Sequence, residues 1–233
     1  MPNTCAIDFG IDNFAAIVCE DGSSAIYKGG AVLSSCQWFH KRRACLTGIM
    51  TKGHVLKCAS SRQLTDLSYH HANFVKDQCH KISRHIINYC LGHRAGTLVL
   101  GINRLWKQRI RIGKQSNQSF VSMPIALLRE LIAYKAMDAG IKVVEQEESY
   151  TSKADVTAGD YIPTYGLDDK NAIFSGKRQK RGLYRCESGT LLNADCNGAA
   201  NILRKAFPDI WKATSDFSFL AAPMVVGFHQ LNP

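Results

Sequence analysis

The chain has 233 residues, with 29 Lys and Arg against 19 Asp and Glu, which gives a formal net charge of +10. The length is enough for one sizeable core, and the 45% hydrophobic and 21% charged fractions exclude wholesale disorder. No apolar run approaches the roughly 20 residues that a membrane span needs, so no membrane partner is expected, and the positive balance indicates a polyanionic partner such as nucleic acid.

Nine cysteines are scattered along the chain, and no two have CxxC spacing. An odd number without paired spacing disfavours a disulfide scaffold and a four-thiolate zinc site. We therefore expect reduced thiols, buried as small hydrophobic residues, in a cytoplasmic protein.

Three short strands joined by tight turns are predicted at the start of the chain, at residues 5–9, 15–19 and 25–27. They form a β-meander. Between about 62 and 91, apolar residues recur at three- or four-residue steps, which predicts a long amphipathic helix.

A second group of elements follows that helix. The buried strand at Thr97–Leu100, a helix from Pro124 to Asp138 and a strand at Ile141–Val144 form a β-α-β run. Such a run implies neighbouring parallel strands. After a polar stretch rich in Gly, Lys and Arg, a helix is predicted at Ala199–Phe207 and ends before Pro208.

This order of elements predicts an α/β fold of the ribonuclease-H-like class, with a mixed sheet between helices. We divide it into a core at 1–150, an inserted subdomain at 151–192 and a C-terminal part at 193–233. Half of an actin-like ATPase opens with the same meander, but it needs a second glycine-rich phosphate loop, and the sequence shows none.

Acidic residues occur at three separate places. Asp8 lies in an apolar strand, where a carboxylate costs free energy unless it is paired or binds a cation; the alternative is a hydrogen-bonded aspartate at the strand end. Asp195 precedes the last predicted helix, where it could simply stabilise the helix N-terminus. Glu145, Glu147 and Glu148 follow the strand at 141–144 and could be a solvated edge.

Two-metal phosphodiester hydrolysis would account for all three places. Mg²⁺ prefers carboxylate oxygens, and two ions about 4 Å apart can activate water and stabilise the leaving oxygen. This chemistry needs carboxylates from distant positions at one end of a sheet, while Lys and Arg hold the nucleic-acid backbone.

Four segments carry a resemblance to a known family: Ile7–Ala15, Val99–Gln108, Glu147–Lys153 and Asn193–Ile202. Together they resemble the RuvC nuclease domain of TnpB (OrfB-type) proteins, RNA-guided DNA endonucleases of insertion sequences that are related to type V CRISPR effectors. Their order and spacing match along essentially the whole chain.

The resemblance implies that Asp8 and Asp195 are the first and third catalytic, metal-binding acids. Most of the family has the second acid at the position of Gly101, but some relatives place it just before the Thr-Ser-Lys motif, where Glu148 stands. Glu147 is the close competitor, and strand alternation should allow only one of the two to reach the site. We favour Glu148, with Mg²⁺ as the cofactor and Mn²⁺ as its substitute.

Two departures from the family matter. The family commonly carries a zinc-binding insertion, but only Cys186 remains near one of its ligand positions, so we expect a degenerate zinc ribbon that holds no zinc. The family's N-terminal half is also absent, which predicts an N-terminally truncated protein. A guide RNA is then expected as a partner if the N-terminal lobes are supplied elsewhere.

Six basic residues are predicted to bind nucleic acid: Lys153, Lys177, Arg178, Lys180, Arg181 and Arg185. Contacts with phosphates would give affinity without sequence specificity, and the alternative is a solvated basic loop. The sequence thus favours a Mg²⁺-dependent DNA endonuclease domain in the cytoplasm, associated with the nucleoid. A catalytically inactive nucleic-acid-binding remnant that regulates its mobile element is the alternative.

Overall fold

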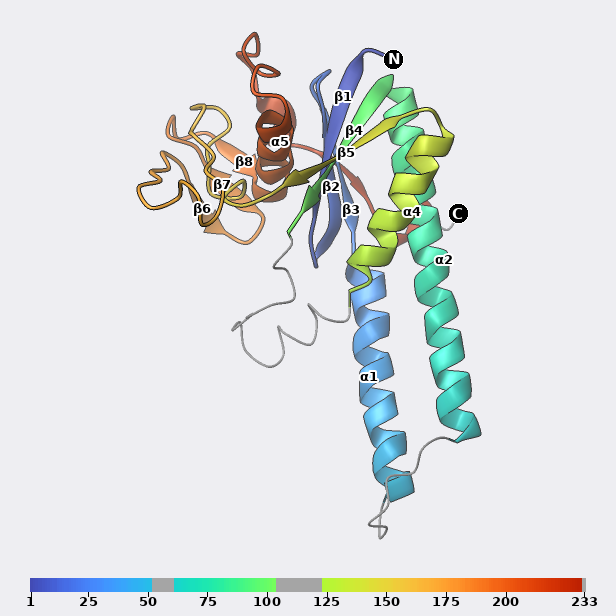
Figure 1. Cartoon of the computed structure of the whole chain (residues 1–233). Coiled ribbons are helices and arrows are strands. Elements are labelled where there is room, and N and C mark those ends of the chain that lie inside the picture. Colours follow the sequence, from blue (N-terminus) through green and yellow to red (C-terminus); the bar gives the residue numbers. More distant parts are fainter. Residues whose placement is uncertain (52–60, 104–122, 232–233) are drawn as a thin grey trace.

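The computed structural model describes residues 1–51, 61–103 and 123–231. Within these ranges the main sheet has six strands in the order β5-β4-β1-β2-β3-β9, with helices on both faces (Figure 1). The strands are β1 (Asn3–Phe9), β2 (Asn13–Cys19), β3 (Ser23–Lys28), β4 (Ala95–Ile102), β5 (Lys142–Glu147) and β9 (Met224–Val226).

The helices divide between the two faces of this sheet. One face is covered by α4, the C-terminal half of α2 and the start of α1, and the other by α5, while the rest of α1 and of α2 extends beyond the sheet (Figure 1). Their bounds are α1 (Gly30–Thr51), α2 (Arg62–Gly92), α4 (Ile125–Asp138) and α5 (Ala194–Ala206); a 3-10 turn, η1 (Ser218–Leu220), and a short α6 (Phe228–Leu231) flank β9.

A second, three-stranded antiparallel sheet lies in the segment before α5. It has the order β6-β7-β8, with β6 (Lys177–Lys180), β7 (Leu183–Arg185) and β8 (Leu191–Asn193). β8 continues directly into α5, so this small sheet is tied to the helix that covers one face of the main sheet.

Strand alternation in β1 decides which side chains face which helices. Cys5, Ile7 and Phe9 belong to the core under α2 and α4, whereas Ala6 belongs to the core under α5. Because successive residues of a strand point to opposite faces, Asp8 shares the α5 side with Ala6. The first predicted acid is therefore directed toward the helix that carries Asp195.

The predicted meander and the parallel β-α-β run are confirmed. β1 pairs antiparallel with β2, and β2 with β3, while β4 and β5 are parallel neighbours joined through α4. The long helix also lies where the apolar periodicity placed it. The result is a mixed α/β architecture.

The sequence did not predict α1, nor the short elements η1, β9 and α6 of the C-terminal tail. α1 has only three buried side chains in 22 residues, so its apolar periodicity is too weak to read. It packs beside α2, where the rings of Phe39 and His71 stack at 4.2 Å. β9 extends the sheet edge by parallel pairing with β3, which a tail without periodicity does not reveal.

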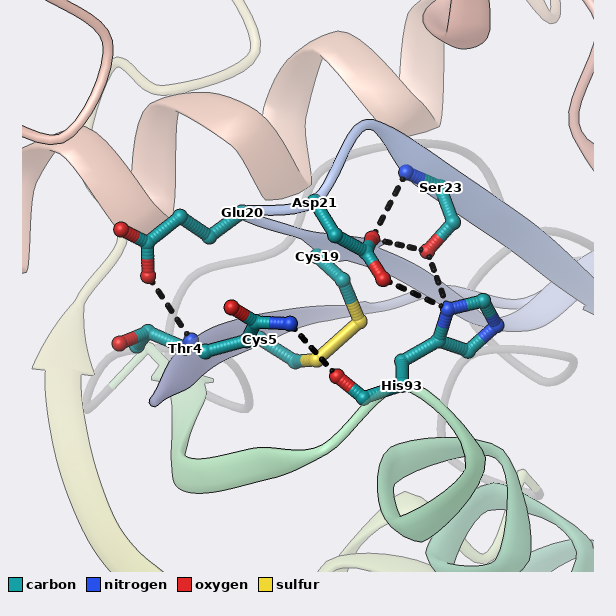
Figure 2. The surroundings of a disulfide bond; sticks show 8 residues. Thr4, Cys5, Cys19, Glu20, Asp21, Ser23 and His93 are labelled. Atoms are coloured by element: carbon teal, nitrogen blue, oxygen red, sulfur yellow. Dashed lines mark hydrogen bonds and ion pairs between the residues drawn. A yellow bond between two sulfur atoms is a disulfide. The ribbon is translucent and has the colours of Figure 1, made fainter. Parts of the chain in front are cut away.

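The expectation of reduced thiols was wrong for one pair of cysteines. Cys5 and Cys19 are direct cross-strand neighbours, with Cα atoms 4.1 Å apart, and they form a disulfide (Figure 2). Composition rules take no account of register, whereas antiparallel pairing sets these residues opposite each other. The other cysteines of the described ranges form no disulfide.

Beside the disulfide, polar contacts join the β2–β3 turn to the end of α2. Asp21 Oδ2 lies 2.8 Å from His93 Nδ1, and Ser23 Oγ donates to Asp21 Oδ1 at 2.5 Å (Figure 2). His93 is the C-terminal cap residue of α2. None of the described helices is both long and apolar enough to cross a membrane.

Candidate functional site

A cleft of about 730 Å³ opens at the ends of β1 and β5, beside the first turn of α5. Four carboxylates line it: Asp12, in the turn before β2, and the three favoured acids, which are Asp8 from β1, Glu148 just after β5, and Asp195 from α5. The three favoured acids are far apart in the sequence and meet because the strand ends and the helix N-terminus converge here. The structure thus brings the three favoured acids to one cleft.

Asp8 reaches this cleft past a glycine in α5. A Cβ added to Gly198 would lie 2.6 Å from Asp8 Oδ2, so any larger residue there would displace the carboxylate. Burial raises the pKa of Asp8 well above its usual range, and the charges of Glu148 and Asp195 raise it further, while Arg178 opposes them. A carboxylate in this state gains from a cation beside it.

Asp195 is placed by the start of α5. Asn193 is the N-terminal cap, and its Oδ1 accepts from the backbone N–H groups of Asp195 at 3.0 Å and Cys196 at 3.2 Å. The helix therefore begins five residues before the predicted Ala199, with Asp195 in its first turn. A negative charge is stabilised at a helix N-terminus, which was the alternative explanation for Asp195, but the side chain also faces the cleft.

Two side chains engage the carboxylate of Asp195. Asn13 Nδ2 donates to its Oδ2 at 2.5 Å, and an Arg178 guanidinium nitrogen donates to its Oδ1 at 3.2 Å. Asn13 in turn accepts from Lys28 Nζ at 2.9 Å through its Oδ1. Both oxygens of Asp195 are thus engaged.

Glu148 occupies space that Gly101 leaves open. Its backbone N–H donates to Ile102 O at 3.1 Å, which continues the β4–β5 pairing by one residue. A Cβ added to Gly101 would lie 2.9 Å from Glu148 Oε2 and 2.7 Å from Ile202 Cδ1. Burial raises the pKa of Glu148 to about 7, against the lowering effect of a hydrogen bond from Asn103.

Glu147 points to a different partner. Lys205 Nζ of α5 donates to Glu147 Oε2 at 2.6 Å, and the backbone N–H of Ser149 donates to Oε1 at 2.6 Å. Burial acts to raise the pKa of Glu147, but these donors outweigh it and lower that pKa below its ordinary value. Glu147 is absent from the cleft lining, so of the two competitors only Glu148 faces Asp8 and Asp195.

The six basic residues separate into two groups. Arg178 and Arg181 line the cleft, where Arg181 forms an ion pair with Asp12. The other four are exposed: Lys177 and Lys180 on β6, Arg185 on β7, and Lys153, whose ammonium lies 5.3 Å from the centre of the Tyr150 ring. An exposed basic strand therefore leads to the acidic cleft.

Sequence reasoning missed Asn13, Lys28 and Asn103 as cleft residues. Asn13 stands in the first quoted segment, five residues after Asp8, but its contact with Asp195 spans 182 positions. Lys28 ends β3, which pairs with β2 opposite Asn13. The meander predicts that pairing only approximately. Trp106 and the rest of 104–108 in the second segment lie outside the described residues.

The donor set suits a hard divalent cation. Carboxylate oxygens are what Mg²⁺ and Mn²⁺ prefer, and Mg²⁺ is often held by one or two carboxylates together with water and substrate phosphate. In the described part of the chain, no three His, Cys, Asp or Glu side chains are gathered closely enough to enclose one ion. An ion held here would therefore have a pair of these acids as ligands and would keep coordination positions for water and phosphate.

In the segment between β5 and β8, two aspartates make hydrogen bonds to residues far along the chain. Asp155, fully buried, accepts from Thr157 N at 2.9 Å through Oδ1 and from Glu187 N at 2.7 Å through Oδ2. Asp160 Oδ2 accepts from the backbone N–H groups of Asp155 at 2.8 Å and Ser175 at 3.0 Å. These bonds join residues 155–160 to the turn after β7 and to the segment before β6.

Comparisons with known proteins find similarity along most of the chain. The family model OrfB_IS605, described as a probable transposase, matches residues 2–106, and the Cas12f1-like TNB domain model matches residues 126–202. The chain is a TnpB-type protein related to the type V effectors. The TnpB-like protein ORF457 of Acidianus two-tailed virus is 27% identical over 86% of this chain and 41% of its own length.

Two further matches are Cas12f proteins, one in sequence and one in fold. The CRISPR-associated endodeoxyribonuclease Cas12f1 of Sulfoacidibacillus thermotolerans is 31% identical over 62% of this chain and 30% of its own length. A solved Cas12f1–sgRNA–target DNA complex has a similar fold, with a TM-score of 0.59 at 17% identity over 86% of this chain and 48% of that one. The chain thus spans less than half the length of each of these relatives.

Proposed function

We propose that this TnpB-type chain is the catalytic part of a Mg²⁺-dependent DNA endonuclease with a RuvC-like site. The observation that carries the proposal is the meeting of Asp8, Glu148 and Asp195 in one cleft with Arg178 and Arg181. The antiparallel β1–β2–β3 meander beside parallel β4 and β5 supports a ribonuclease-H-like fold. The relationship to proteins named as endodeoxyribonucleases supports the reaction class.

Each acid has a role in this proposal. Asp8, Glu148 and Asp195 would hold Mg²⁺, with Mn²⁺ as a substitute. When bound, the metal would polarise the phosphodiester and lower the pKa of an attacking water. Arg178 and Arg181 would bind the phosphate and orient it toward the acids. Hydrolysis in this manner leaves 5′-phosphate and 3′-hydroxyl ends.

The remaining basic residues would hold the nucleic-acid backbone. Lys177 and Lys180 on β6, Arg185 on β7 and Lys153 are exposed on the insertion that carries the two cleft arginines. They would add affinity that does not depend on sequence and weakens with salt. Target DNA is the substrate in this proposal. A guide RNA would be held with the help of lobes outside this chain, in the cytoplasm at the nucleoid.

The insertion would keep its structure without zinc. Asp155 and Asp160 join its parts through hydrogen bonds, and Cys186 is buried at the end of this arrangement. The observation supporting a zinc-free insertion is that a carboxylate, rather than a thiolate pair, connects the first loop to the turn after β7.

Cleavage of labelled single-stranded DNA by the purified chain tests the nuclease proposal. With Mg²⁺ or Mn²⁺, the wild type should cut, and Asp8→Asn, Glu148→Gln and Asp195→Asn should not. Glu147→Gln is the matched control because it removes the neighbouring carboxylate outside the cleft, and it should keep cutting. Cleavage by Asp8→Asn at the wild-type rate would refute the assignment.

A catalytically inactive nucleic-acid-binding remnant is the second candidate. The observation that favours it is that Asn13 and Arg178 already engage both oxygens of Asp195. Binding of Mn²⁺ discriminates the two, because a remnant can keep the fold and the basic surface without holding the ion. Titration of the wild type and Asp8→Asn with Mn²⁺ decides the matter: saturable binding lost in the variant contradicts the remnant.

A further inference from the structure

The two groups that engage Asp195 differ in how they are held. Asn13 begins β2, an inner strand of the main sheet, and its amide is oriented by Lys28. Arg178 lies on β6, which in the described part of the chain pairs with β7 alone, at the edge of the small sheet, and has all four residues exposed. The side chain of Arg178 is 45% exposed. Asn13 is therefore a fixed partner of Asp195, whereas Arg178 can move away at little cost in packing.

Arg178 and a divalent cation compete for the same place. The guanidinium donates to Asp195 Oδ1, and its positive charge also acts on Asp8. A divalent ion on these acids would repel a guanidinium beside it, because like charges a few ångströms apart strongly disfavour each other in a partly enclosed cleft. One cation must leave when the other arrives, and the weakly packed Arg178 is the one that can.

We propose that Arg178 is an exchangeable counter-ion of the acidic cleft. It neutralises Asp195 while the cleft lacks metal, and it moves to a substrate phosphate when a divalent cation takes its place on Oδ1. The inference rests on the proposed function and deepens it. Arginine suits this exchange because its planar guanidinium pairs with carboxylate and phosphate in the same two-pronged way.

The exchange has a thermodynamic consequence. A phosphate that accepts Arg178 removes the competitor of the metal, and a metal that displaces Arg178 frees it for the phosphate. Metal and DNA therefore strengthen each other's binding by one shared factor, as linkage requires. Removal of Arg178 abolishes both the competition and the coupling.

Calorimetric titration of the full chain with Ca²⁺, with and without a short single-stranded DNA, tests the proposal through binding rather than cleavage. Ca²⁺ is a hard cation with the same oxygen preference, and a gel confirms that the DNA stays intact. In the wild type, DNA should tighten Ca²⁺ binding about fivefold or more, a coupling of ordinary size. Arg178→Ala should bind Ca²⁺ more tightly than the wild type without DNA, and DNA should then add little.

Arg181→Ala is the matched control. It removes an equal charge from the same cleft, but from the pair with Asp12 rather than from Asp195. As a phosphate-binding residue it should weaken DNA binding itself, but it should change Ca²⁺ affinity without DNA less than Arg178→Ala does and keep the Ca²⁺–DNA coupling. If Ca²⁺ bound equally more tightly to both variants, net charge alone would explain the effect and the proposal would be overturned. Weaker Ca²⁺ binding by Arg178→Ala, or a coupling to DNA as strong as in the wild type, would also overturn it. A wild type that binds no Ca²⁺ would refute the proposed metal site itself, which is a separate result.

Discussion

Gly101 and Glu148 occupy adjoining space: a Cβ on residue 101 would lie 2.9 Å from the Oε2 atom of Glu148. The resemblance gives most relatives an acid at the position of Gly101, on β4. Here the carboxylate belongs to Glu148, the residue after β5, which is the parallel strand beside β4. Its side chain occupies the space beside Gly101. The glycine is therefore required by Glu148, since both positions cannot carry a side chain there without displacement.

Gly101→Ala tests this relationship. The added methyl group meets Ile202 Cδ1 at 2.7 Å and Glu148 Oε2 at 2.9 Å, so the site must shift. We expect unfolding free energy to fall by about 1–3 kcal/mol, as for other overpacked cores, and Mn²⁺ affinity to fall with it. Urea denaturation and Mn²⁺ titration measure the two.

Gly48→Ala is the control for that experiment. Gly48 lies in α1, and a Cβ there meets nothing within 4 Å. The substitution should raise stability by about 0.5–1 kcal/mol, because it only reduces the entropy of the unfolded chain. A Gly101→Ala variant with wild-type stability and metal binding would show that Glu148 does not need this space.

The neighbouring glutamates should respond in opposite ways to substitution. Glu147→Gln removes a carboxylate paired with Lys205, whose side chain is only 10% exposed, so we expect a loss of about 1–3 kcal/mol in stability. Glu148→Gln removes a charge that repels Asp8, so it should leave stability unchanged or higher while Mn²⁺ binding is lost. Thermal denaturation with and without Mn²⁺ measures both. The assignment fails if Glu147→Gln is the variant that loses the ion.

The parts of the fold and the site that depend on local sequence could be predicted, whereas those that depend on contacts between residues far apart in the chain could not. Strand alternation and the order of elements were enough to place Asp8, because successive residues of a strand point to opposite faces of the sheet. The choice between Glu147 and Glu148 depends on Lys205, a contact that spans 58 positions. The pairing of Cys5 with Cys19 depends on a register that periodicity does not fix. Long-range contacts, rather than local patterns, were the part that the sequence left open.

The small insertion should be stable without zinc and should depend on Asp155. Asp155→Asn keeps the size of the side chain but replaces one acceptor oxygen with a donor, which would face the N–H groups of Thr157 or Glu187. We expect a loss of about 1–3 kcal/mol, the cost of a buried polar group left without its partner. A chelator should not change the unfolding temperature of the wild type. Stoichiometric zinc in the purified protein would contradict this account.

The raised pKa values in the cleft predict how stability depends on pH. Burial raises the pKa of Glu148 to about 7, and that of Asp8 also lies well above its usual value. The folded chain therefore keeps protons that the unfolded chain has already released, so these groups lower stability as the pH rises from about 4, the unfolded carboxyl pKa, through the folded values. A divalent cation favours the deprotonated acids, so stabilisation by Mg²⁺ should grow over the same range.

Unfolding temperatures measured across this pH range with a chelator and with Mg²⁺ check that prediction. Burial acts to raise the pKa values of Asp155 and Asp21, but hydrogen bonds from donors such as Thr157 and Ser23 lower them below their ordinary values. These two carboxylates therefore make the folded chain more stable as the pH rises, which is opposite to the effect of the cleft acids. The difference between the wild type and Asp8→Asn or Glu148→Gln isolates the cleft from these groups. Each variant should lose part of the destabilisation near neutral pH and all of the Mg²⁺ effect. A wild type whose Mg²⁺ stabilisation is equal at acidic and neutral pH would contradict the prediction, because its cleft acids would then carry full charge throughout.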